Sequence, residues 1–196
     1  MVDTTKGKGA IFLLVGLALT GSLLLAPEYE AAKDYYGYGL RVTARTTFAF
    51  FMLAYIARPL VQVMGSGQWL VRHRRYLGLA AALSHTVHFL FIVLYFRETG
   101  EPIDLVTLIL GGASFVLFWL MALTSNRPSI KALGPWWGRL HTTGMHWAWV
   151  IFFQSWVGGA MEVPWQWALV AVSIAGLALR VLAWRKRRRP ALAAAT

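Results

Sequence analysis

RHRRYLGLAAALSHTVHFLFIVLYF, residues 72–96, is the stretch that decides the fold. It opens with three arginines and continues for about twenty apolar residues, the length of helix that spans a hydrocarbon layer of roughly 30 Å. His85 and His88 lie inside this apolar run, three residues apart and therefore on one helical face. A charged side chain inside lipid costs roughly 2.5 kcal/mol or more, so titratable residues there are candidates for function. The stretch predicts a transmembrane helix that carries part of a functional site.

The composition of the whole chain agrees with a membrane protein. Hydrophobic residues make up 58% and charged residues 14%, against roughly 45–50% and 25% in soluble proteins. The mean hydropathy is +0.54. The absence of cysteine excludes disulfides, iron–sulfur clusters, zinc thiolate sites and cysteine nucleophiles. We expect the 196 residues to form a single transmembrane domain, residues 1–196.

Six apolar segments predict an all-α, polytopic six-helix transmembrane bundle. They lie near residues 11–26, 42–64, 76–96, 103–123, 140–157 and 165–184. Turn-forming residues separate them at 65–67, 100–102, 126–128 and 158–159. The first segment also resembles a signal peptide, because Lys6 and Lys8 precede about fifteen apolar residues, although Pro27 makes a poor cleavage junction.

The basic residues predict the orientation, because cytoplasmic loops of membrane proteins are enriched in Lys and Arg. One side of the expected bundle carries thirteen: Lys6, Lys8, Arg72, Arg74, Arg75, Arg127, Lys131, Arg139, Arg185, Lys186, Arg187, Arg188 and Arg189. The other side carries four: Lys33, Arg41, Arg45 and Arg97. Both termini are therefore expected to be cytoplasmic, in a multi-pass protein of the inner (cell) membrane. The net charge of +11 does not form one patch, so we expect no nucleic-acid partner and interpret residues 185–189 as an anchor on anionic membrane lipid.

Four of the five histidines lie within two expected helices that run in the same direction. At about 1.5 Å of rise per residue, His85 and His146 lie at similar depths, and His88 is level with Gln154. His141 is shallow, near the basic side. The fifth histidine, His73, stands among arginines and is expected to be solvated.

Neutral imidazoles on facing helices can hold a heme iron from both sides, which suits electron transfer. Arg45 on the outer side and Arg75 on the inner side are candidate partners for heme propionates, as are Arg41, Arg97 and Arg139. Alternatively, the histidines hydrogen-bond to each other or to helix carbonyls across the bundle. A divalent metal site at His85 and His88 is disfavoured because no intramembrane carboxylate joins them.

Two motifs resemble those of ferric reductase-like transmembrane proteins. The first is Arg74-Arg75-Tyr76-Leu77-Gly78-Leu79, followed by His88 ten residues after Gly78. The second is Leu123-Thr124-Ser125, then Leu133-Gly134 and Trp137-x-Arg139-Leu140-His141. That family includes the heme-bearing membrane subunit of the periplasmic methionine sulfoxide reductase system, the six-helix metalloreductases and the NADPH oxidases. The resemblance covers roughly residues 72–154 and implies heme b between the third and fifth helices.

The resemblance also implies which residues bind the heme. His88 matches the ligand of the third helix, and His141 matches the first histidine of the fifth helix. Gln154 stands where the family commonly has its second histidine of that helix, and glutamine is a poor iron ligand. His146 is a candidate substitute ligand of the iron, paired with His88 or His85; the other interpretation is a bundle that keeps the fold without heme.

Two functions follow from these observations. The first is a membrane-embedded heme b electron-transfer protein, relaying electrons from a cytoplasmic reductase or quinol to an outer-side acceptor. It would be the subunit of an oxidoreductase, because the chain has no glycine-rich dinucleotide motif and no flavin domain. The alternative is a heme-free accessory subunit of a larger membrane complex, binding lipid, pigment or quinone. An ion transporter is disfavoured by the lack of midplane carboxylates.

Overall fold

A computed structural model describes residues 4–25 and 35–193 of the chain, which are helical apart from short connections. The helices are α1 (Thr4–Leu25), α2 (Tyr35–Met64), α3 (Gln68–Thr99), α4 (Leu105–Leu123), α5 (Arg127–Leu133), α6 (Pro135–Glu162) and α7 (Trp167–Ala193), with a 3₁₀ turn η1 (Pro164–Gln166) before α7. No strand occurs among these residues, so the expected all-α class is confirmed.

Several of these helices have the length and hydropathy of membrane spans. Four stretches qualify: 35–64, 68–99, 105–123 and 164–187. Only 17–28% of the most apolar part of the last three is buried inside the bundle, so their apolar surfaces face outward. A chain with several such helices is a multi-pass α-helical membrane protein. The assignment of α1 and α6 as two further spans remains a prediction.

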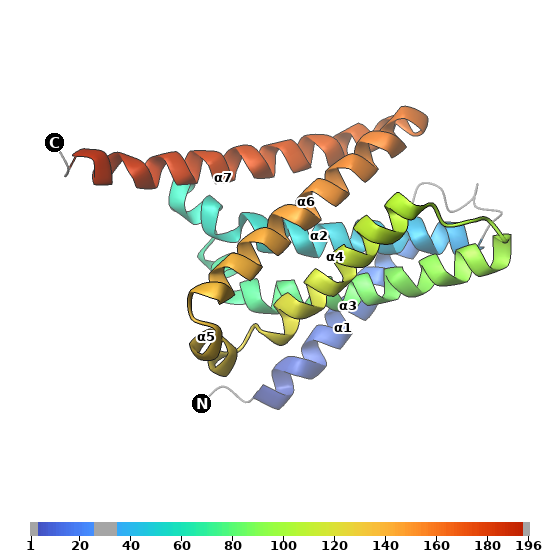
Figure 1. The fold of residues 1–196 in the computed structure, drawn as a ribbon, viewed down its shortest axis with the longest axis horizontal. Coiled ribbons are helices and arrows are strands. Elements are labelled where there is room, and N and C mark those ends of the chain that lie inside the picture. The colour runs from blue at the N-terminus through green and yellow to red at the C-terminus, as the bar shows by residue number, and fades with distance from the viewer. Residues whose placement is uncertain (1–3, 26–34, 194–196) are drawn as a thin grey trace.

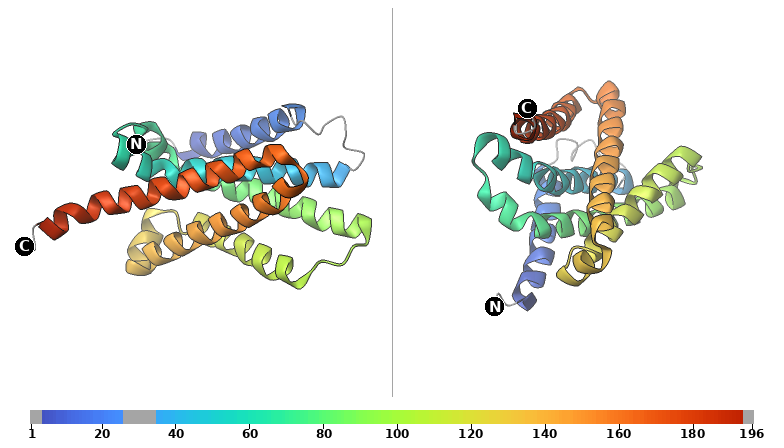
Figure 2. Two further views of the ribbon diagram at one scale, coloured as in Figure 1. Left: turned by 90° about the horizontal axis from the view of Figure 1, so that it is seen from above. Right: turned by 60° about the vertical axis from the view of Figure 1, so that its left-hand side comes forward.

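Helix α2 is the centre of the molecule. It packs against α1, α3 and α7, and runs through the middle of the bundle (Figures 1 and 2). Its aromatic residues extend the core toward α4 and α6: Phe51 contacts Phe118 and Phe152, and Phe48 contacts Phe152 and Trp156. Half of its most apolar stretch is buried, which explains why this helix contains threonines and glycines as well as large apolar residues.

Hydrogen bonds between neighbouring helices set their register. Thr47 and Ser84, both fully buried, join α2 to α3 through their hydroxyls at 2.9 Å. The indole Nε1 of Trp119 donates to Thr86 of α3, and that of Trp147 donates to Ser114 of α4, each at 3.1 Å. Such bonds contribute about 0.6 kcal/mol each on average in membrane proteins, so they fix geometry more than they add stability.

A proline inside α2 creates an attachment point for α7. Pro59 has no N–H, so the carbonyl of Tyr55, four residues earlier, loses its usual helix donor. Arg180 of α7 donates to this carbonyl from Nη1 at 3.2 Å, and its guanidinium stacks on the Tyr55 ring at 4.3 Å. The sequence therefore compensates a buried backbone acceptor with a side chain from a distant helix.

The helix ends differ from the sequence expectation in several places, three of which bear on the site. α2 begins at Tyr35, before the expected residue 42, and α3 begins at Gln68, so its basic cluster lies inside the helix. The turn expected at Gly158-Gly159 was wrong, because both residues lie within α6. The side chain of Gln166 packs against the Cα of Gly159, and the chain reverses direction after this contact, at Val163.

The two ends of the bundle carry different charges. We call the end where α2 and α7 finish, and α3 and α6 begin, the basic end; it is on the left in Figure 1, beside α5. The opposite end holds the α3–α4 loop and the α6–α7 turn. All acidic residues in the described part of the chain belong to the opposite end: Glu98, Glu101, Asp104 and Glu162.

Candidate functional site

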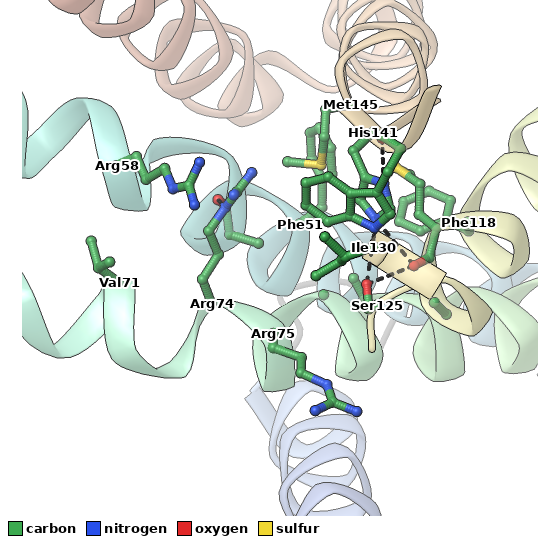
Figure 3. Close-up of a pocket in the computed structure, with 16 residues that line it drawn as sticks. Phe51, Arg58, Val71, Arg74, Arg75, Phe118, Ser125, Ile130, His141 and Met145 are labelled. Atoms are coloured by element: carbon green, nitrogen blue, oxygen red, sulfur yellow. Dashed lines mark hydrogen bonds between the residues drawn. The ribbon is translucent and has the colours of Figure 1, made fainter. Parts of the chain in front are cut away.

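A cavity of about 260 Å³ lies between α2, α3, α4 and α6 at the basic end. We call it the His141 cavity (Figure 3). Its wall is mostly apolar and includes Phe51, Phe118 and Met145. Arg58 and Arg74 lie together on the side away from His141 (Figure 3). An apolar space with cations at one edge suits a flat apolar ligand that carries negative groups at one side.

The ring nitrogens of His141 lie near three oxygen atoms. Nδ1 lies 3.0 Å from the carbonyl of Trp137, and Nε2 lies 3.2 Å from the carbonyl of Met121 and 3.3 Å from Oγ of Ser125. The Ser125 hydroxyl already donates to the Met121 carbonyl at 2.6 Å. A neutral imidazole has one N–H, so Nδ1–H donates to Trp137 in one tautomer and Nε2–H donates to Met121 in the other. In the first tautomer Nε2 has the lone pair of a metal-ligating histidine, whose other nitrogen is held by a carbonyl.

Residues from both sequence motifs line this one cavity. Gly78 belongs to the first motif, and Ser125 and Trp137 belong to the second. A Cβ on Gly78 would meet no atom within 4 Å, so the cavity is open above this glycine. The Trp137 ring stacks on His141 at 4.0 Å and its Nε1 donates to the carbonyl of Thr124, which fixes the imidazole against the α4–α5 connection.

His88 has the same ligand-type tautomer, in a different place. Its Nδ1 lies 3.0 Å from Oγ1 of Thr43, whose single hydroxyl hydrogen is donated to the carbonyl of Gly39 at 2.7 Å. When the Thr43 hydroxyl donates to Gly39, its oxygen accepts from Nδ1–H of His88, and Nε2 carries the lone pair. Thr43 belongs to α2 and was not singled out from the sequence, because only the packing of α2 on α3 brings it to the histidine.

His85 is a core residue in this structure. It is 9% exposed, and its ring contacts Phe118 at 4.7 Å and the His88 ring at 5.7 Å between centroids. Its Nδ1 is buried without a hydrogen-bond partner among the described residues. It therefore packs beside His88 without holding it through a hydrogen bond.

His146 lines a second cavity, of about 500 Å³, between α2, α3, α6 and α7. Its Nδ1 lies 2.7 Å from the carbonyl of Thr142, which leaves Nε2 as the lone-pair nitrogen. Four arginines also line this space, so we call it the arginine cavity. They are Arg58, Arg74, Arg180 and Arg187. His73 makes the same contact with the carbonyl of Trp69 in an exposed setting. The tautomer alone therefore does not identify an iron ligand, and a position beside a cavity is needed as well.

Arg45 and Arg75, two of the five predicted propionate partners, lie at different cavities. Arg75 lines the His141 cavity but is exposed. Arg45 lines a third cavity, of about 490 Å³, near the opposite end, and its guanidinium stacks on Trp165 at 4.6 Å. Arg58 lines the same cavity as Arg75. It was not predicted as a propionate partner, although it is an arginine inside an apolar segment.

The structure brings some predicted residues together and leaves others apart. His141 lines both basic-end cavities, and His146 lines one of them. His88 lines none of the three cavities. Helix α4 packs against both α3, which carries His88, and α6, which carries His141 and His146. Gln154 is exposed on α6. The described residues contain no group of three or more His, Asp or Glu placed to hold a metal ion.

These features define the class of the protein: an all-α, multi-pass membrane protein with a histidine-bearing cavity near one face. Among curated proteins, the chain is 28% identical over 187 residues to the protein-methionine-sulfoxide reductase heme-binding subunit MsrQ of Ralstonia nicotianae. The similarity covers 83% of this chain and 81% of that protein. No family model matches the chain, and no solved structure matches it.

Proposed function

We propose that this chain is a membrane-embedded, heme b-binding electron-transfer subunit of the ferric reductase-like type. In this proposal the single domain crosses the inner membrane six times, through α1, α2, α3, α4, α6 and α7, with both termini cytoplasmic. The excess of Lys and Arg at the basic end supports that orientation. The named heme-binding relative, similar over most of both chains, supports the cofactor.

One observation carries the proposal more than any other. Two motifs that are about forty residues apart in the sequence line one apolar cavity, and the His141 imidazole of the second motif is held there by carbonyls of Trp137 and Met121. The residues present fit a heme there: a nitrogen ligand, an apolar wall, open space above Gly78, and arginines at one edge. Heme b would supply a one-electron carrier that changes little in geometry between its oxidation states.

Each residue then has a definite task. His141 would bind the iron through Nε2 while the Trp137 carbonyl holds Nδ1 and the Trp137 ring holds the plane of the imidazole. Arg58 and Arg74 would bind the propionate carboxylates, with Arg75 at the rim. The apolar wall formed by α2 and α4 would exclude water and so set the reduction potential.

The other histidines extend the proposal toward the opposite end of the bundle. Among the candidate ligands, His88 lies nearest the opposite end, and its Nδ1 contacts Thr43. His146 remains the second iron ligand that we propose from α6. His85 would support the position of His88 by packing. Arg45, near Trp165, would be the cation for propionates on that side.

Electrons would enter from a cytoplasmic reductase or a membrane quinol and leave to an outer-side protein partner. The relative is named as a subunit of a methionine sulfoxide reductase, which supports a protein redox partner for this chain as well.

Transmembrane electron transfer can be tested with proteoliposomes. Purified protein, reconstituted with heme, is placed in vesicles that contain trapped cytochrome c, and dithionite is added outside. We expect reduction of the trapped cytochrome c well above the rate in protein-free vesicles. His73→Ala, which changes a histidine outside the cavities, should keep the rate, whereas His141→Ala should lower it. Equal rates with and without protein would contradict the proposal.

A heme-free accessory subunit is the second candidate. The observation that favours it is the position of Gln154 on an exposed part of α6, together with the absence of His88 from the cavities. It predicts that a variant with His85, His88, His141 and His146 all changed to Phe or Ala assembles normally and co-purifies with a fixed membrane partner.

A further inference from the structure

We propose that the arginine cavity binds the phosphate group of an anionic phospholipid. This site lies between α2, α3, α6 and α7 and is distinct from the His141 cavity, although Arg58 and Arg74 border both. The proposal goes beyond electron transfer and does not depend on it.

The first support is the arrangement of positive charge. Arg180 and Arg187 come from α7, Arg58 from α2 and Arg74 from α3, and all four line a space of about 500 Å³. Arg180 uses Nη1 for the Tyr55 carbonyl, and Arg74 uses Nε for the Ala54 carbonyl at 3.1 Å. Each guanidinium keeps further N–H donors, which match phosphate oxygens in pairs. Four cations around one space repel each other unless an anion lies between them.

The second support is that the described chain supplies no such anion. No Asp or Glu lines the cavity. Glu98 is 24 residues after Arg74 on the same helix, a separation of roughly 36 Å. Glu162 is 20 residues after Thr142 of the cavity wall, roughly 30 Å along α6. No carboxylate of the described residues is therefore placed to balance the charge of Arg180 and Arg187, which the propionates proposed for Arg58 and Arg74 also leave unbalanced.

The depth of the cavity indicates the source of the anion. The run Arg185, Lys186 and Arg187 marks the membrane surface on α7, and Arg180 lies only about 7 Å further in along the helix axis. Trp137 and Trp184, residues typical of the interface, also line the cavity. Phospholipid phosphates occupy this level, and basic pockets between helices on this side of a membrane bind anionic headgroups.

The experiment measures lipid retention by native mass spectrometry of the full-length protein in detergent, with equimolar phosphatidylglycerol and phosphatidylcholine. We expect wild type to retain phosphatidylglycerol about tenfold over phosphatidylcholine. Arg180→Gln with Arg187→Gln should remove that preference. The control is Arg127→Gln with Arg139→Gln, which removes two charges at the same end but outside the cavity, and it should keep the preference.

Further arms separate the possible outcomes. The pair Arg180→Lys and Arg187→Lys keeps the charge and should keep most of the preference. If the Arg180 variants do not fold by circular dichroism, Arg187→Gln alone, an exposed side chain, still has to lower it. Millimolar inorganic phosphate that displaces the lipid, or binds without it, would identify a site for phosphate as such, and the headgroup would be one of its sources.

The proposal is overturned if wild type shows no preference and binds no phosphate, or if the control loses as much as the Arg180 and Arg187 variants. Absorbance of added heme is recorded on the same samples. The two cavities share Arg58, Arg74 and His141, but Arg180 and Arg187 line the arginine cavity alone, so their variants are expected to lose the lipid preference and keep the heme absorbance.

Discussion

At the scale of single residues, the hydrogen bonds of the histidines carry the most information. Three candidate ligands, His88, His141 and His146, have Nδ1 within hydrogen-bond distance of an oxygen, and Nε2 has the lone pair when Nδ1 carries the proton. The acceptor is a carbonyl one turn earlier for two of them and a threonine of another helix for His88. Because the hydrogen-bond partner of His88 is a side chain of α2, a single substitution can remove it. The partners of the other two are main-chain carbonyls, which a substitution leaves in place.

Thr43→Val tests this dependence. Valine keeps the size of threonine but removes the oxygen that accepts from Nδ1 of His88, so we expect heme affinity at His88 to fall about 10- to 100-fold. The measurement is a heme titration followed by Soret absorbance. Thr46→Val is the matched control, because Thr46 lies on the same helix and bonds to Ser22 instead. Equal affinity in the Thr43 and Thr46 variants would show that Thr43 does not orient the ligand.

At the scale of helices, α2 is held against α3 and against α7 by two different contacts, and each can be tested by its own substitution. Toward α3, Gly39 lies against the ring of Phe91 so closely that no Cβ fits without displacing the ring. Toward α7, the Tyr55 carbonyl freed by Pro59 accepts from Arg180.

Gly39→Ala should destabilise the protein by about 1–3 kcal/mol, because the added methyl group overpacks the α2–α3 contact. Gly111→Ala is the control: nothing lies within 4 Å of its Cβ position, so the gain in helix propensity should leave it neutral or up to about 1 kcal/mol more stable. Thermal unfolding in detergent, followed by circular dichroism, measures both. A neutral Gly39→Ala would mean that the two helices are not in close contact there.

The link between Pro59 and Arg180 predicts non-additive energies. Arg180→Met leaves the buried Tyr55 carbonyl without a donor, which costs about 1–3 kcal/mol. In a Pro59→Ala background the new N–H of residue 59 can donate to that carbonyl, so Arg180→Met should cost less. A double-mutant cycle of unfolding free energies gives the coupling. The same cost in both backgrounds would argue against the compensation.

Much of this helical arrangement could be predicted from the sequence, and the exceptions have physical reasons. Apolar runs of membrane length identified the helices, and Gly65, Gly67 and Gly100 end or begin helices with positive φ, as turn formers should. The turn predicted at Gly158 and Gly159 was wrong because glycine also allows close packing inside a helix, here between Gly159 and Gln166. The motif residues were recognisable, but their meeting around one cavity depends on packing between helices, which no local pattern contains.

At the scale of the whole molecule, charge divides the bundle into two ends and predicts its orientation. The chain has no cysteine, so single cysteines can be introduced and labelled without background. A membrane-impermeant maleimide added to intact cells should label Glu101→Cys, in the α3–α4 loop, and should not label Lys131→Cys, in α5, until the membrane is opened. The reverse labelling would invert the orientation, and labelling of both would contradict a membrane between them.

The central claim is that His141 binds a heme iron in the basic-end cavity, and one absorption measurement tests it most directly. Protein expressed with ample heme is purified, and its spectrum is recorded oxidised and then reduced with dithionite. The account predicts a Soret band that shifts on reduction in wild type and His73→Ala, and that is weakened or displaced in His141→Ala. A colourless wild-type protein, or a His141→Ala spectrum identical to wild type, would contradict it.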